Sequence, residues 1–180
     1  LKAKLRYPPS DEFRVVVLLP MKPNNGQDDT RGQLGVLAEA DGERGRFLAC
    51  TLSQTGSDPN PVYVHAKVGI VDDRWLTVGS ANLNEHSLFN DSEVNVVSHN
   101  PELARRTRLQ LWAEHLGQPA ETLEGDPATI IDEVWRPIAH EQLERRAAGA
   151  PLTHGVVGLR HVSRRSKRLL GPLQSLLVDG

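Results

Sequence analysis

Five short runs of apolar residues, rich in β-branched side chains, predict β-strands along the first hundred residues of the chain. The first run is closed by Pro20, and its unbroken apolar character is typical of a strand that is covered on both faces. Loops are expected at residues 21–30 and 53–61, where proline, asparagine and glycine gather. The predicted strands are residues 13–19, 46–52, 62–71, 75–80 and 93–97.

Capping residues and helical periodicity predict two long helices in the second half of the chain. The first should span residues 100–116, because an asparagine followed by proline favours a helix start and a glycine follows the last apolar position. The second, at residues 126–149, begins in the same way with aspartate and proline. A weaker helix is expected at residues 33–40. The segment 151–180 shows no regular pattern and is interpreted as a basic, irregular tail that follows one domain at residues 1–150.

The composition is that of an ordinary globular domain, with 38% hydrophobic and 24% charged residues. No apolar run approaches the roughly 20 residues of a transmembrane helix. A net charge of −2 argues against a general electrostatic attraction to nucleic acid. A local basic cluster in the tail is either solvated surface or a contact for anionic lipid headgroups. Its members are Arg160, Arg164, Arg165, Lys167 and Arg168.

Neither the start of the sequence nor its single cysteine indicates the cellular compartment of the protein. Cys50 is the only cysteine, so no disulfide can form within the chain. The sequence opens at Leu1 with neither an initiator methionine nor a targeting segment, which we interpret as the mark of a fragment.

The strand expected at residues 62–71 carries two polar side chains suited to phosphate chemistry. Because successive side chains alternate, His65 and Lys67 should project from one face, about 7 Å apart along the chain. An imidazole, whose pKa is ordinarily about 6.5, can serve as nucleophile, acid or base near neutral pH. The lysine ammonium can balance negative charge that develops around phosphorus.

Residues that follow this strand can complete a phosphate site. Asp72 lies in the expected turn, and Gly79 allows the backbone to approach a ligand closely. Ser80 and Asn82 offer a hydroxyl and an amide to phosphate oxygens. The second ring nitrogen of a catalytic histidine needs an acceptor, and Glu93, at the start of the next strand, is the candidate.

Each of these residues also has a structural explanation. A single histidine on a strand is usually a surface or hydrogen-bonded residue. Asp72 is favoured in turns for local hydrogen bonding, and that can be its whole role. Gly79-Ser80 is a turn signal, and Glu93 alone is a solvated strand end. Joint occurrence at the spacing H-x-K-x4-D-x6-G-S-x-N favours the functional interpretation.

This spacing resembles the HKD motif of the phospholipase D superfamily. The similarity extends over residues 13–140 and resembles the C-terminal catalytic half of two-motif phospholipases D, with one departure at His86-Ser87, where many relatives carry Arg-Ser. The resemblance implies an α/β fold: a mixed β-sheet flanked by helices, half of an α/β/α sandwich. The segments that carry the resemblance, within the motif and beyond it, are residues 63–67, 70–73, 79–84, 91–93 and 111–117.

The resemblance also implies a mechanism, in which one HKD histidine forms a phosphohistidine while another protonates the leaving alcohol. As a second-motif histidine, His65 would be the general acid and base, with the nucleophile as its alternative role. The resemblance needs neither a cofactor nor a metal, and the remaining histidines show no metal-ligand spacing, so we predict none. It places His65, Lys67, Asp72 and Glu93 among the catalytic residues and Lys67, Ser80 and Asn82 at the substrate phosphate.

Three functions remain open at this point. The first is a phosphodiesterase that hydrolyses glycerophospholipids at a membrane surface, transfers the phosphatidyl group to alcohols, and needs a second HKD half or a second copy of the chain. The second is an HKD nuclease acting as a homodimer, although its relatives tend to be shorter and basic, and no nucleic acid is expected here. The third is an inactive fragment or a binding module.

Overall fold

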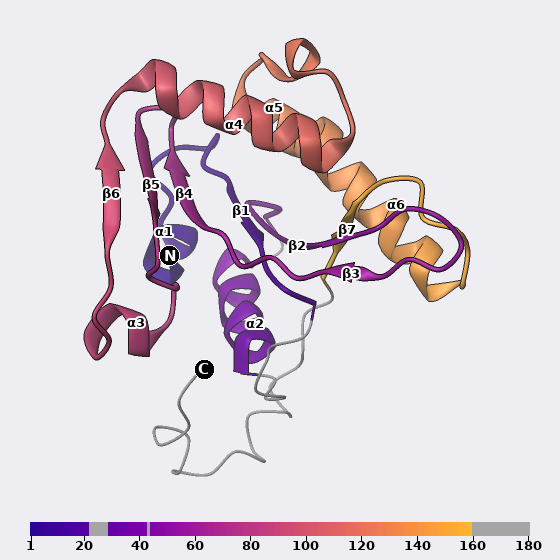
Figure 1. The fold of residues 1–180 in the computed structure, drawn as a ribbon, viewed down its shortest axis with the longest axis horizontal. Coiled ribbons are helices and arrows are strands. Elements are labelled where there is room, and N and C mark those ends of the chain that lie inside the picture. Colours follow the sequence, from indigo (N-terminus) through magenta and orange to yellow (C-terminus); the bar gives the residue numbers. More distant parts are fainter. Residues whose placement is uncertain (22–28, 43, 160–180) are drawn as a thin grey trace. The chain divides into compact units, whose positions relative to one another are not determined.

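The computed structural model describes residues 1–21, 29–42 and 44–159, which form two compact units (Figure 1). One unit combines residues 1–64 with the described residues from 125 onward, and the other is residues 65–124. Each contains a β-sheet and helices, so the expected α/β class is confirmed. Most of the loop expected at residues 21–30 and all of the basic cluster in the tail lie outside the described residues.

The sheet of the first unit is organised around β2 (Phe47–Ser53). This strand pairs in parallel with β1 (Val15–Leu18) and antiparallel with β3 (Pro61–Val62) and β7 (Val156–Gly158). The apolar runs predicted β1 and β2 correctly. β7 corrects the expectation that residues 151–180 are irregular throughout, because a three-residue strand is too short to show a periodic pattern.

Helices α1 (Lys2–Arg6) and α2 (Asp29–Asp41) cover one face of this sheet. The prediction of a helix at residues 33–40 is therefore confirmed, and the helix is longer than expected. Apolar side chains from both helices meet alternate residues of β2, which is how a two-layer packing forms a shared core. The buried members of this core are Leu5, Leu34, Ala40, Phe47 and Ala49.

The opposite face of the sheet is covered by α6 (Arg136–Ala147), which packs on β7. The backbone of Gly158 lies so close to α6 that a Cβ there would approach the Ala139 carbonyl oxygen to 3.1 Å. Cys50 lies directly opposite Gly158 in the β-ladder and is fully buried on the same face.

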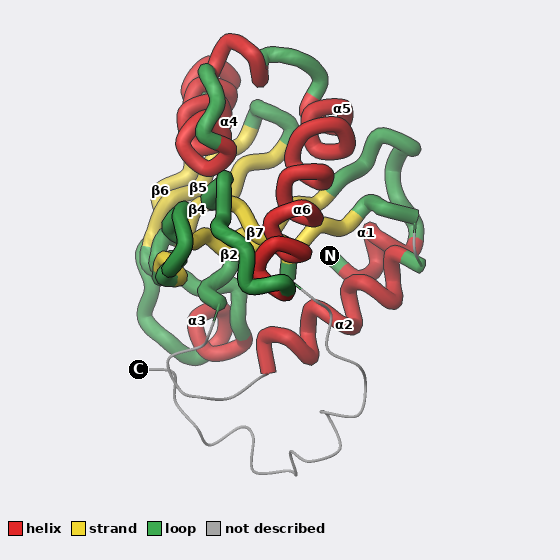
Figure 2. Tube along the Cα trace, turned by 90° about the vertical axis from the view of Figure 1, so that its right-hand side faces the viewer, coloured by secondary structure: helices red, strands yellow, loops and turns green. Residues whose placement is uncertain are grey.

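The helix predicted at residues 126–149 consists of three consecutive segments. α5 (Pro127–Ile130) passes through a π-helical turn (Ile131–Trp135) into α6, and Figure 2 shows α5 and α6 following one another along one column. Asp126 caps its start, because its carboxylate accepts the N–H of Thr129 at 2.9 Å. Trp135 is completely buried at the π-helical turn.

The second unit contains an antiparallel sheet of three strands, β4 (Lys67–Val71), β5 (Trp75–Gly79) and β6 (Asn95–Ser98), in that order. The single strand predicted at residues 62–71 is wrong, because residues 63–66 form no strand between β3 and β4. The reason is a change of partner: β3 pairs with β2, whereas β4 pairs with β5. An alternating pattern does not reveal where a chain leaves one ladder and joins another.

Helices lie at both ends of this second sheet (Figure 1). α3 (Glu85–Phe89) lies in the connection between β5 and β6, and α4 (Pro101–Leu116) follows β6 and packs against β4 and β5 near their turn. The predicted caps of α4 are confirmed: the side chain of Asn100 accepts the N–H of Leu103 at 3.2 Å, and Gly117 ends the helix at φ 63°. Within the described residues, no helix combines the length and the apolar character that crossing a membrane requires.

Candidate functional site

Three positions of the second sheet form a row at the end where β4 begins. Lys67 pairs with Gly79, and Gly79 pairs with Asn95, so all three lie on one face of neighbouring strands. Gly79 leaves a gap in the row that only glycine can provide: a Cβ at this position would overlap the side chain of Asn95 and the carbonyl oxygen of Val94. Glycine at this position therefore makes room for the Asn95 side chain beside Lys67.

His65 lies two residues before β4, and its side chain contacts that of Lys67. The distance between His65 Nε2 and Lys67 Nζ is 2.7 Å. The expectation that these side chains project the same way is confirmed, although His65 is outside a strand. An ammonium group can only donate, so Nε2 must accept this hydrogen bond and the ring proton resides on Nδ1. The imidazole is thus held with its Nε2 lone pair toward a cation that phosphate would also attract.

Ser80 and Glu93 meet across the base of the loop that joins β5 to β6. The Ser80 hydroxyl donates to the Glu93 carboxylate, and Ser80 Oγ accepts the backbone N–H of Val94 at 3.0 Å. The hydrogen bond from Ser80 is the main cause that lowers the pKa of Glu93, followed by one from Ser87 and the positive charge of Lys67. Glu93 is therefore a carboxylate that is favoured by the positive charge of Lys67. Its alignment of the His65 ring stays a prediction.

Ser87 is a member of this group that the sequence analysis did not assign. Its side chain is buried, with 7% of the residue exposed, and its hydroxyl lies 3.4 Å from the amide nitrogen of Asn82. The backbone N–H of Ser87 donates to Asn84 Oδ1 at 2.8 Å. Ser87 thus links the Asn82 amide to the Glu93 carboxylate. A serine three residues after asparagine is a local capping signal, but it does not indicate these longer contacts.

Asp72 lies at the opposite end of β4, in the turn that leads to β5. It is five residues from Lys67, about 16 Å along an extended strand, so the structure does not bring it to the group around Lys67. Asp72 and Asp73 have φ of 51° and 52°, and the carbonyl of Val71 accepts the N–H of Arg74 at 3.0 Å. These are features of a tight hairpin turn, and aspartate tolerates the left-handed conformation better than most residues.

A comparison with protein families gives one match that includes this group of residues. The family model described as phospholipase D matches residues 52–146. The match covers more than half of the chain and contains His65, Lys67, Ser80 and Glu93. The chain belongs to the phospholipase D family. The match begins at residue 52, whereas the resemblance was expected to extend back to residue 13.

Curated relatives from plants carry the same family name. Phospholipase D alpha 1 of Spuriopimpinella brachycarpa is 34% identical over 115 residues, that of Nicotiana tabacum 35% over 115, and that of Arabidopsis thaliana 34% over 116. Each similarity covers 53% of this chain and 14% of the relative. The part of these phospholipases D that matches is therefore about one seventh of their length.

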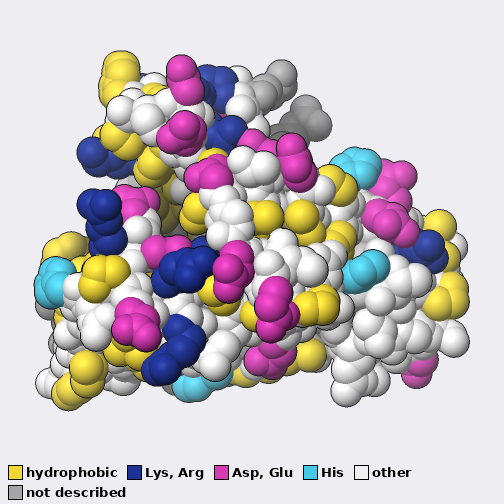
Figure 3. All heavy atoms as spheres, turned by 90° about the horizontal axis from the view of Figure 1, so that it is seen from above, with side chains coloured by type: hydrophobic (Ala, Val, Ile, Leu, Met, Phe, Trp, Pro, Cys, Tyr) yellow, Lys and Arg dark blue, Asp and Glu magenta, His cyan; other side chains and the backbone are white. Residues whose placement is uncertain are grey.

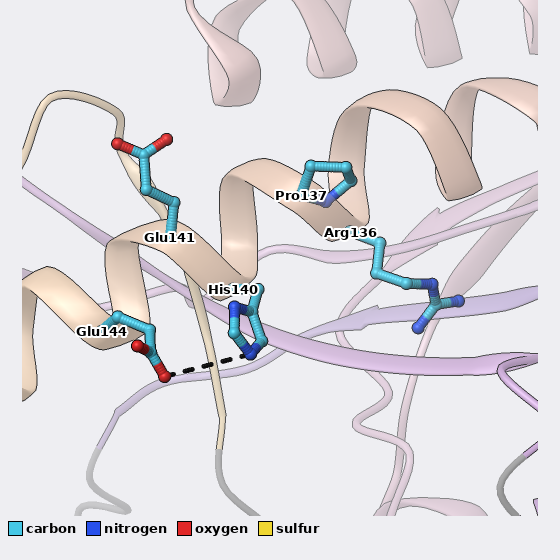
Figure 4. Close-up of a pocket in the computed structure, with 5 residues that line it drawn as sticks. All are labelled: Arg136, Pro137, His140, Glu141 and Glu144. Atoms are coloured by element: carbon cyan, nitrogen blue, oxygen red, sulfur yellow. Dashed lines mark ion pairs between the residues drawn. The ribbon is translucent and has the colours of Figure 1, made fainter.

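Elsewhere in this phospholipase D family member, Asp132 pairs with both Arg14 and Arg136. In the described ranges no three potential ligand side chains come together as a metal site. A shallow depression on α6 is lined by the residues labelled in Figure 4, where His140 lies 4.0 Å from Glu144. The neighbouring Glu141 pairs with Arg145 one helical turn away, as is common on a solvated helix.

Basic and acidic side chains are interspersed on the face drawn in Figure 3. A single-sign basic surface is what usually accompanies backbone recognition of nucleic acid. The mixed face agrees with the net charge of −2 for the whole chain.

Proposed function

We propose that this chain supplies one half of the active site of a phospholipase D-type phosphodiesterase that acts on glycerophospholipids. The observation that carries the proposal is the convergence of the His65–Lys67 pair and the Ser80–Glu93 pair at one end of one sheet. Membership of the phospholipase D family supports the same chemistry. A phospholipid substrate implies that the protein works at a membrane surface, which we include in the proposal.

In the proposed complex, phosphate oxygens of the substrate bind at Lys67, Ser80 and Asn82. The Lys67 ammonium turns its hydrogen bond from His65 Nε2 to a phosphate oxygen, because the anion is the stronger acceptor. Nε2 is then free to bind a proton, which the adjacent phosphodiester favours electrostatically. The His65 ring, with Glu93 as the acceptor for its Nδ1–H, becomes the general acid.

The reaction then proceeds in two displacements at phosphorus. A histidine of a second HKD half attacks phosphorus, the bond to the headgroup oxygen breaks, and His65 gives its Nε2 proton to that oxygen. In the second step the neutral imidazole of His65 takes a proton from water, whose oxygen attacks phosphorus. The phosphorus–nitrogen bond breaks, and the phosphatidic acid leaves. An acceptor alcohol can replace water in this step.

The second histidine must come from outside this motif, since the sequence contains only one HKD run. Either an N-terminal HKD half or a second copy of the chain could supply it. A second copy makes activity depend on protein concentration, because only the associated form has two motif histidines. An N-terminal half in the same polypeptide makes the specific activity independent of concentration.

The test is choline release from phosphatidylcholine vesicles, measured over a range of protein concentrations. His65→Asn should abolish release, while His99→Asn, an exposed histidine of the same unit, is the matched control and should retain it. Equal activity of the two variants would refute the assignment of His65. Hydrolysis of single-stranded DNA without choline release would favour the nuclease instead. Hydrolysis of neither substrate at any concentration, both by this chain and by the chain joined to an N-terminal HKD half, would support an inactive fragment or binding module.

A further inference from the structure

Asn95 connects the strand before the phosphate-binding loop to the loop itself. It is the first residue of β6 and lies opposite Gly79. Its Nδ2 donates to Thr77 Oγ1 at 3.2 Å, and its Oδ1 accepts the backbone N–H of Ala81 at 3.2 Å. One amide side chain therefore joins β5, β6 and the first turn of the loop.

The residue before Ala81 is also held by short hydrogen bonds. The N–H of Ser80 donates to the Val94 carbonyl at 3.0 Å, and Ser80 Oγ accepts the Val94 N–H at 3.0 Å. These bonds fix the backbone before Ala81, and Asn95 fixes Ala81 itself. Gly79 makes this packing possible, because any larger residue would occupy the space of the Asn95 amide.

The fixed peptide lies between the two residues that are expected to hold the phosphate. Ala81 separates Ser80 from Asn82, so a rotation of its backbone would move the Asn82 side chain relative to Ser80 and Lys67. A binding site that depends on several donors loses affinity when one segment that carries them becomes mobile.

We propose that Asn95 is a positioning residue of the phosphate site: through its bond to the Ala81 N–H it orients Asn82 relative to Ser80. This inference rests on the proposed function, because it assumes that these side chains bind a phosphate. Asn95 acts through the backbone of Ala81 and does not itself contact the substrate.

The amide geometry of Asn95 suits this role. Its oxygen accepts from the loop while its nitrogen donates to the threonine, so the Thr77 bond orients the oxygen toward Ala81. Thr77→Val should therefore weaken the hydrogen bond between the Ala81 N–H and Asn95, and it should have this effect only while Asn95 is present. Asn95→Ala removes both bonds and should loosen the loop directly.

The experiment measures hydrogen exchange of the Ala81 amide and the dissociation constant for inorganic phosphate, both by NMR. Asn95→Ala should raise the Ala81 exchange rate about tenfold and weaken phosphate binding by a similar factor, which is the effect expected for one net hydrogen bond. Val96→Thr, on the same strand and the opposite face, is the matched control and should change neither quantity. Adding Thr77→Val to Asn95→Ala should have no further effect.

Two results would overturn the inference. One is an Asn95→Ala variant with the Ala81 exchange rate and phosphate affinity of the Val96→Thr control. The other is a loss of phosphate affinity without faster Ala81 exchange, which would show that Asn95 acts by another route. A wild-type chain that binds no phosphate contradicts the proposed function, and this failure is distinct because the exchange rate is measured without phosphate.

Discussion

The ion pair between Arg108 and Asp73 should be the strongest single polar contribution to the stability of the second unit. Arg108, on α4, donates from Nε and Nη2 to the two carboxylate oxygens of Asp73 at 2.7 and 2.8 Å. Its third contact is the Leu123 carbonyl at 3.3 Å, and its guanidinium carbon lies 4.6 Å from the centre of the Trp112 ring. The pair fixes the helix to the β4–β5 turn. The informative substitution is Asp73→Asn, because asparagine keeps the shape and tolerates φ 52°.

The magnitude follows from the unequal burial of the two partners. The side chain of Arg108 is 5% exposed and that of Asp73 is 19% exposed. Removing one partner of a buried ion pair costs about 3–5 kcal/mol. Asp73→Asn leaves the buried guanidinium without a counter-charge but with its carbonyl and aromatic contacts, so we expect about 3 kcal/mol, the lower end of that range. Arg108→Met leaves the more exposed carboxylate, which water can solvate, and should cost about 2 kcal/mol.

An exposed ion pair in the same unit provides the control. Arg105 lies 3.5 Å from Glu124, with side chains 47% and 57% exposed. Glu124→Gln should cost less than about 1 kcal/mol. Native-state hydrogen exchange of the β4 and β5 amides reports the stability of this unit separately from that of the other, and urea unfolding followed by tryptophan fluorescence gives an independent value.

The ordering of the variants decides the outcome. The reasoning requires Asp73→Asn to be more destabilising than Arg108→Met, and both to exceed Glu124→Gln. If Asp73→Asn costs no more than the exposed control, the guanidinium is not effectively desolvated and the argument from burial is wrong.

Three further predictions concern single side chains. Ser80→Ala should raise the pKa of Glu93 toward its ordinary value in a carbon-13 titration. The variant lacks the hydrogen bond from Ser80, which favours the ionised carboxylate at higher pH and is lost as the carboxylate protonates; an unchanged midpoint would contradict this. Burial raises the pKa of Cys50 to about 12, so a thiol reagent should label it only on unfolding, and rapid labelling of the native protein would be inconsistent with the fold. Gly79→Ala should cost about 1–3 kcal/mol in thermal unfolding through overlap with Asn95, and a wild-type melting temperature would show that the loop yields easily.

The regular elements could be predicted from the sequence where a local signal is strong. The β-branched runs located β1 and β2, and the caps at Asn100 and Gly117 located α4 to within one residue. The break after Val62 could not be predicted, because it depends on which strand each segment pairs with, and pairing is not encoded in a local pattern. β7 escaped prediction for a related reason: its three residues form a strand because β2 is available beside them.

The candidate site divides in the same way. The motif spacing indicated that His65, Lys67 and Ser80 belong together, and the need of a catalytic histidine for an acceptor added Glu93. The structure places two pairs of these residues in contact. Asn95 contributes contacts that cross strands, which a pattern along one segment does not indicate. The turn at Asp72 was predicted from its composition, but the partner of the adjacent aspartate comes from a helix more than thirty residues away.

Formation of phosphatidylethanol from phosphatidylcholine in the presence of ethanol is the most direct test of the central claim, that this chain contributes half of a phosphohistidine-forming site. A covalent intermediate partitions between water and alcohol, so the account predicts that phosphatidylethanol accumulates at the expense of phosphatidic acid as ethanol rises. Both products should disappear in the Lys67→Met variant. Phosphatidic acid formed without any phosphatidylethanol, or phosphatidylethanol formed equally by the Lys67→Met variant, would contradict the account.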